Sequence, residues 1–197
     1  MNIKKSVLAI ATIVGLLGLT GCTNQPKPQA PKCSIDGSDN APHWVCDNGS
    51  TMEGGIFAVG SAEPSPLGRN FQVTTATAAA RDALAREMSV KVKNMFKKFQ
   101  ATTGVGKDQT VDQAIQNVSK QLAKVTLTGS KPVQFWTSPK GTLYVLVGMP
   151  NKIAEEKVKN AVKTSFKNNK ALWQKFLAQK ADKNLDKEIA KEFGSEN

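Results

Sequence analysis

The sequence is poor in the side chains that most enzymes use for their chemistry. Its 197 residues include one histidine, His43, and one tyrosine. A Ser–His–acid triad would need His43, and a zinc site could combine His43 only with Cys33 and Cys46, in a spacing unlike that of zinc fingers. The sequence contains no HExxH motif, and Gly104–Lys107 lacks the remaining residues of a phosphate-binding loop. We therefore expect no enzymatic activity, no bound metal and no cofactor.

Long apolar segments are also scarce. The longest mainly apolar stretch, Val7–Leu19, has thirteen residues, fewer than the roughly 20 that a membrane-spanning helix needs. Two lysines precede it, and Gly21 and Cys22 follow it. A positive start, a short apolar segment and small residues before a cysteine are typical of a bacterial lipoprotein signal. We predict cleavage between Gly21 and Cys22 and lipid attachment to the Cys22 sulfur. The alternative is an ordinary signal peptide or N-terminal anchor in which Cys22 has no role.

The predicted export restricts the partners of the chain. Thr23 follows the cysteine, at a position where Asp retains a lipoprotein of enteric bacteria at the inner membrane, so we expect lipid anchoring at the outer membrane. The chain is basic, with 27 Lys and Arg residues against 16 Asp and Glu. Export removes nucleic acid, the usual partner of a basic cytosolic protein. Lipid phosphates, lipopolysaccharide and acidic neighbours remain, and a solvated helical surface is the simpler interpretation.

Cysteine is rare beyond the predicted lipidation site. Only Cys33 and Cys46 remain, and an exported protein meets an oxidising environment in which disulfides persist. We predict a disulfide between these two residues, as a local staple near the tether. Closing a loop of this size contributes about 3 kcal/mol in the loop-entropy description. The zinc site that would include His43 is the alternative.

Shifts in composition divide the chain into four segments. Residues 1–21 are the signal peptide, which is removed, and residues 22–40 carry the lipidated cysteine and a proline-rich tether, for which extended geometry is expected. Residues 41–168 form an α+β domain. Residues 169–197 form a basic amphipathic C-terminal helix.

The spacing of apolar residues predicts a small, mostly antiparallel sheet packed by long amphipathic helices, in the order strand, helix, helix, strand, strand, helix. The predicted strands are 56–60, 125–127, 133–136 and 143–147, and the predicted helices are 70–99, 111–124, one that starts after Pro150, and 170–193. Residues 143–147 are apolar on both faces, which is typical of a central strand.

Several side chains carry specific expectations. The alanine-rich stretch 76–80 would let a partner surface approach the first long helix closely, and Ile153 should face inward on the helix after Pro150. Leu177 should join the apolar stripe of the last helix. Trp136 and Trp173 are candidate interaction residues, because aromatic residues are enriched at protein interfaces. Packing in the core is the alternative for both.

Four blocks of the sequence carry a resemblance to a known family. They are residues 41–45, 55–62, 76–85 and 143–149. In order and approximate spacing, downstream of the lipoprotein signal, they resemble the Helicobacter Lpp-twenty family of small outer-membrane lipoproteins, which includes FlgP-type flagellar lipoproteins. The resemblance covers about residues 41–166. The C-terminal basic helix and the two cysteines of the predicted staple depart from the family pattern.

The resemblance implies an outer-membrane lipoprotein with a small strand–helix–strand–strand domain that associates with copies of itself. In FlgP-type members it implies a structural role that supports flagellar rotation. We therefore expect a non-enzymatic assembly protein of the cell envelope, with other envelope or flagellar proteins as further partners. The alternatives are an envelope module that binds a ligand between sheet and helices, and a lysine-driven binder of lipopolysaccharide or peptidoglycan.

Overall fold

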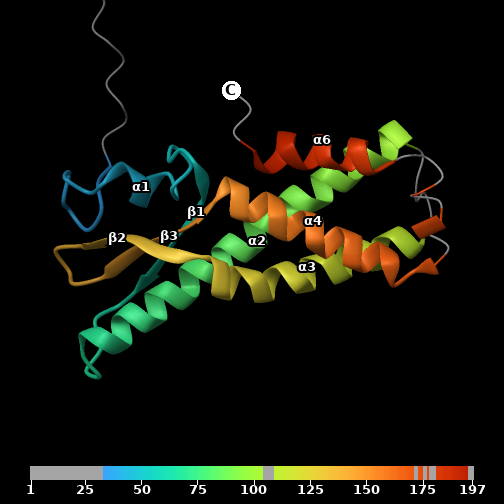
Figure 1. Cartoon of the computed structure of the whole chain (residues 1–197). Helices are drawn as coiled ribbons and strands as arrows, with labels where there is room; N and C mark the ends of the chain where they lie inside the picture. The colour runs from blue at the N-terminus through green and yellow to red at the C-terminus, as the bar shows by residue number, and fades with distance from the viewer. Residues whose placement is uncertain (1–32, 104–108, 171–172, 175–176, 178–180, 195–197) are drawn as a thin grey trace, which may run out of the picture. The chain divides into compact units, whose positions relative to one another are not determined.

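The computed structural model describes residues 33–194, except 104–108, 171–172, 175–176 and 178–180 (Figure 1). The predicted signal peptide, its cleavage site at Gly21 and Cys22, and most of the tether therefore lie outside the described residues, as does Gly104–Lys107. Within the described part of the chain, no helix is both long and apolar enough to cross a bilayer.

The predicted α+β class and order of elements are confirmed. The helices and strands, in chain order, are α1 (His43–Cys46), β1 (Gly55–Ala62), α2 (Arg69–Thr103), α3 (Gln109–Gly129), β2 (Lys131–Thr137), β3 (Leu143–Pro150), α4 (Asn151–Lys167) and α6 (Ala181–Phe193).

The three strands form one antiparallel sheet in the order β1-β3-β2. The predicted central position of residues 143–147 is confirmed, since β3 pairs with β1 on one side and with β2 on the other. Leu143, Val145 and Val147 are buried on the helix side of β3, and Leu146 is buried on its opposite side. A strand that is buried on both faces needs apolar residues at successive positions, and this is the pattern that β3 carries.

The helix α2 covers one face of the sheet and packs closely on β1 (Figure 1). A Cβ atom on Gly60 would lie 2.2 Å from the backbone nitrogen of Ala80 and 2.3 Å from the carbonyl oxygen of Ala76. The absence of a side chain at Gly60 and the small methyl groups of α2 together allow this approach. The close approach expected at the alanine-rich stretch is therefore confirmed, but β1 of the same chain makes it by covering Ala76 and Ala80.

Beyond the sheet, α2, α3, α4 and α6 pack into a helical bundle (Figure 1). Phe96 and Phe99 of α2 and Phe166 of α4 lie at its centre, with the rings of Phe96 and Phe166 5.8 Å apart. The predicted apolar stripe of the last helix is confirmed for three α6 residues, which are buried: Leu185, Ile189 and Phe193. The bundle extends the hydrophobic core well past the end of the small sheet.

Three local expectations are wrong. Val125–Leu127 is helical rather than extended, because α3 continues to Gly129. The Thr126 hydroxyl is buried and donates a hydrogen bond to the carbonyl oxygen of Leu122 at 2.8 Å, so packing against the core outweighs the preference of β-branched residues for strands. Ile153 and Leu177 are exposed rather than buried, at 37% and 51% of their surface. Ile153 lies in the first turn of α4, where the helix begins beyond the edge of the core.

Residues 33–54 lie on the sheet face opposite α2. A Cβ atom on Gly49 would lie 2.8 Å from Leu146 and 2.9 Å from the Cβ of Phe57, both on that face. Trp44 in α1 is buried. The hydroxyl of Ser138 donates a hydrogen bond to the Asp36 carboxylate at 2.5 Å, which ties this segment to the β2–β3 turn.

Candidate functional site

The disulfide predicted between Cys33 and Cys46 is confirmed. The two Cα atoms are 5.8 Å apart, and the bond joins the first described residue to the end of α1. The disulfide uses both cysteine sulfurs that the alternative zinc site would need as thiolate ligands. His43 is exposed on α1, and the described residues hold no group of three or more His, Cys, Asp or Glu side chains placed to bind a metal ion.

The two candidate interaction residues occupy different settings. Trp136 lies half-buried on β2, where its ring packs at a tilt against the ring of Tyr144 of β3, with centroids 5.5 Å apart. Desolvation raises the pKa of the Tyr144 hydroxyl, and the negative charges of Asp36 and Glu63 raise it further. Trp173 is partly buried against the helical core, and the Lys167 ammonium lies 5.5 Å from its ring centroid. The structure therefore does not bring the two tryptophans together.

The outer edge of β2 is the most open strand edge in the described residues. Val133 and Phe135 keep 48% and 49% of their surface exposed. The edge of β1 differs, because the Val59 N–H donates a hydrogen bond to the Asn48 side-chain oxygen at 2.9 Å. Among the described residues, β3 is the only strand that pairs with β2. Its outer backbone groups are therefore open to pair with another strand.

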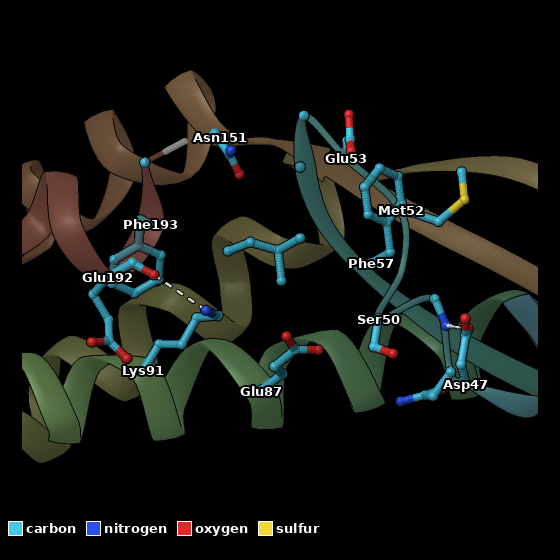
Figure 2. A pocket seen from close by; sticks show the side chains of 16 residues that line it. Asp47, Ser50, Met52, Glu53, Phe57, Glu87, Lys91, Asn151, Glu192 and Phe193 are labelled. Atoms are coloured by element: carbon cyan, nitrogen blue, oxygen red, sulfur yellow. Dashed lines mark hydrogen bonds between the residues drawn. The ribbon is translucent and has the colours of Figure 1, made fainter. Parts of the chain in front are cut away.

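A polar cleft of about 520 Å³ lies between residues 47–57, α2, the start of α4 and the end of α6. Figure 2 shows Glu87 and Lys91 on α2 along one side, with Glu53 and Asn151 across from them. The Lys91 ammonium donates a hydrogen bond to the carbonyl oxygen of Glu192 at 3.2 Å, which closes the α6 end.

Acidic side chains outnumber basic ones in this cleft, although the chain as a whole is basic. The Asp47 carboxylate is engaged locally, since it accepts hydrogen bonds from the Gly49 N–H at 2.8 Å and the Thr51 hydroxyl at 2.5 Å. Burial raises the pKa of Glu87, and the nearby Lys91 charge opposes that rise. Chemically, the cleft can hold a cationic or hydrogen-bonding group.

A comparison with protein families decides what kind of protein this is. Residues 42–150 match the model of the LPP20 lipoprotein family. The chain belongs to that family. The predicted resemblance is confirmed, and the match runs from the residue before α1 to the last residue of β3. No curated protein matches the sequence.

Membership makes the chain an envelope lipoprotein that is anchored to a membrane. The matched residues include the sheet, α2 and α3, the exposed edge of β2 and the disulfide-linked Cys46. The helices α4 and α6 follow the matched region. The cleft residues in 47–57 and on α2 therefore belong to the LPP20 domain, whereas those at the end of α6 do not.

Two features of the surface were missed by reasoning from the sequence. Phe135 was assigned to a strand without being recognised as exposed. Pro132 in the same run could have indicated an edge strand, because proline within a sheet is confined to edge strands and bulges. The cleft around Glu87 had no sequence signal, because its lining comes from residues up to about 150 positions apart that only the packing of α6 brings together.

The raised pKa of Glu87 predicts a pH-dependent gain of stability on its replacement. When the pKa of a carboxyl is higher in the folded than in the unfolded state, its ionisation lowers the free energy of unfolding. This loss begins near the unfolded pKa and is complete above the folded pKa. We expect Glu87→Gln to raise the free energy of unfolding of this protein at pH 7. The gain should fall toward zero below pH 4, where the Glu87 carboxyl of the wild type is protonated in both the folded and the unfolded state.

Urea denaturation of the Glu87→Gln variant and the wild type at a series of pH values measures this difference. The neighbouring Asp82→Asn variant is the matched control, because Asp82 is exposed on the same helix. A Glu87→Gln variant that is less stable than the wild type at pH 7 would show that the ionised carboxylate makes a favourable interaction instead.

Proposed function

We propose that this LPP20 lipoprotein is a non-enzymatic structural protein of the outer membrane that assembles with copies of itself through the outer edge of β2. The observation that carries the proposal is the exposure of Phe135 beside an edge that no other described strand covers. Antiparallel strand pairing is self-complementary, so two copies of one edge can satisfy each other about a twofold axis.

The sequence of β2 limits where such pairing can occur. The strand begins with Lys131 and Pro132, and its register with β3 shifts between Pro132 and Gln134. Lysine, proline and a bulge are features by which natural proteins block edge pairing. Pairing is therefore confined to Gln134–Thr137, which places Phe135 and Trp136 at the centre of the proposed contact.

The lipid anchor strengthens such a contact. Acyl chains on Cys22 confine every copy to one membrane plane, which raises the effective concentration for lateral pairing. A short edge contact that is weak for a protein in solution then suffices on the membrane. Lipidation of Cys22 and the outer-membrane location are part of this proposal.

Site-specific photocrosslinking in living cells tests the assembly. A benzophenone amino acid at Phe135 of the full-length chain should produce an adduct of twice the chain mass on irradiation. The matched control is the same amino acid at Val90, an apolar residue of α2 with 56% exposure, which should give little or none. Equal yields at the two positions, or no adduct at Phe135 in well-expressed protein, would count against the β2 edge.

A role in flagellar motility is the finer part of the proposal, and it rests on the resemblance to FlgP-type lipoproteins alone. Deletion of the gene should then reduce swimming in soft agar, and expression of the wild-type chain should restore it. The Phe135→Glu variant should fail to restore it if assembly is the relevant activity. Normal swimming of the deletion strain would remove this part and leave the assembly proposal standing.

A further inference from the structure

A second, smaller cavity lies at the end of the sheet where α3 ends and α4 begins. Its volume is about 260 Å³, below the roughly 300–1,000 Å³ of sites that enclose a whole small molecule. Its lining is mainly apolar, with one charged side chain, and consists of Gly54, Phe57, Gly129, Lys131, Val133, Gly148, Met149, Pro150 and Ile153.

Glycines and a bulge create this hollow. The ring of Phe57 extends over Gly148, where a Cβ atom would lie 2.5 Å from the Phe57 ring and 3.2 Å from Val133. Gly129, at the end of α3, similarly leaves space beside Met149, whose methyl group would lie 3.0 Å from an added Cβ. The shift in register next to Pro132 adds Val133 as an extra residue on the rim. The cavity is thus bounded by backbone and mainly by aromatic and apolar side chains.

Two exposed apolar side chains mark the open side of the cavity. Val133 is 48% exposed and Ile153 is 37% exposed, and both line the hollow. The outward position of Ile153, which contradicted the sequence pattern, places an apolar side chain at the mouth. An apolar hollow with an apolar rim favours a ligand that brings a hydrocarbon group out of water.

The charge at the mouth is positive. Lys131 is the charged residue of the lining, and its side chain is exposed beside Val133. Pro150 is the N-cap residue of α4 and Ile153 lies in its first turn, and no side chain caps this helix end. The positive end of the helix dipole therefore adds to the Lys131 charge. A negative headgroup is the complement of this rim.

We propose that the cavity binds the apolar end of an anionic amphiphile, with the carboxylate or phosphate of the ligand beside Lys131. The volume admits the end of one acyl chain rather than a whole lipid. The ligand chemistry is shared by free fatty acids and by anionic phospholipids of the membrane to which the protein is anchored. This site is separate from the β2 pairing contact, which uses residues 134–137, so either proposal can fail alone.

Photolabelling of the full-length chain in isolated membranes tests the site. The two probes are dodecanoate and phosphatidylglycerol, each with a diazirine near the end of an acyl chain, and peptide mass spectrometry locates the label. We expect label on peptides that contain Phe57, Met149 or Ile153, and we expect unlabelled dodecanoate to compete. The probe that labels these peptides at the lower concentration identifies the source of the ligand.

Paired variants separate specific binding from labelling by the bilayer. Ile153→Trp fills the mouth and should reduce label on the cavity peptides at least tenfold, whereas Val90→Trp, at an exposed apolar position of α2, should leave it unchanged. Lys131→Glu should reduce label about 1.4- to 5-fold, the range for an exposed ion pair. Lys93→Glu, at an exposed position of α2, is its control.

Label on the cavity peptides that Ile153→Trp does not reduce, or label that unlabelled dodecanoate does not displace, would overturn the proposal. So would a protein–protein adduct formed by a benzophenone amino acid at Ile153, because it would show that a second copy occupies the mouth. The disulfide, scored by mobility on non-reducing gels, reports that each variant is folded.

Discussion

Replacing Cys22 with Ala should abolish lipid attachment and remove the protein from the outer-membrane fraction. The Cys22 sulfur is the predicted acceptor of the lipid, and each buried methylene of an acyl chain contributes about 0.8 kcal/mol to membrane binding. Two or more chains make the attachment effectively stable, so losing them changes partitioning almost completely. The remaining Val7–Leu19 segment is too short to span a bilayer in their place.

Metabolic labelling with an alkyne fatty acid, followed by membrane fractionation, measures both effects. The matched control is the Cys33→Ser/Cys46→Ser double variant, which loses two cysteines but keeps Cys22 and should retain its label. Persistent labelling of the Cys22→Ala variant would show that the lipid is attached elsewhere, and the predicted signal would then be wrong.

Removing the disulfide between Cys33 and Cys46 should destabilise the folded domain by about 3 kcal/mol, the value for a loop of this length in the loop-entropy description. The bond closes residues 33–46 over the sheet face that carries Leu146. A loss of that size corresponds to a decrease in Tm of about 6–12 °C for a chain of 150–250 residues.

Thermal denaturation of the full-length chain, with and without a reducing agent, checks this effect. The reducing agent should lower the Tm of the wild type to that of the Cys33→Ser/Cys46→Ser variant, and it should leave the variant unchanged. A wild type whose Tm is insensitive to complete reduction would show that the segment is held by its packing, through contacts such as that of buried Trp44, and that the bond adds little.

Patterns that depend on local spacing predicted most of the fold. The central strand β3, the long helix α2 and the start of α4 follow from apolar runs, from three- and four-residue periodicity, and from Pro150. The strand expected at Val125–Leu127 was wrong because its β-branched residues favour extended structure only weakly, and the burial of Thr126 against the core decided in favour of helix.

The surface features depended on tertiary packing and were harder to predict. Asn48 protects the edge of β1, but its contact with Val59 joins residues eleven positions apart in a loop with no regular pattern. The alanine-rich stretch of α2 was correctly identified as a place of close approach, but its partner is Gly60 of the same chain. The exposure of Phe135 and Ile153 depends on where the helical layer ends. The spacing of apolar residues within one strand or helix carries no information about that boundary.

The central claim is that copies of this LPP20 lipoprotein pair through the β2 edge on a membrane. The most direct test is the mass of the lipidated full-length chain in nanodiscs, measured by mass photometry for the wild type and the Phe135→Glu variant. We predict that the wild type contains two or more copies in each disc at protein-to-disc ratios at which the variant contains one. A wild type that stays at one copy per disc, or a variant that associates as well as the wild type, would contradict the account.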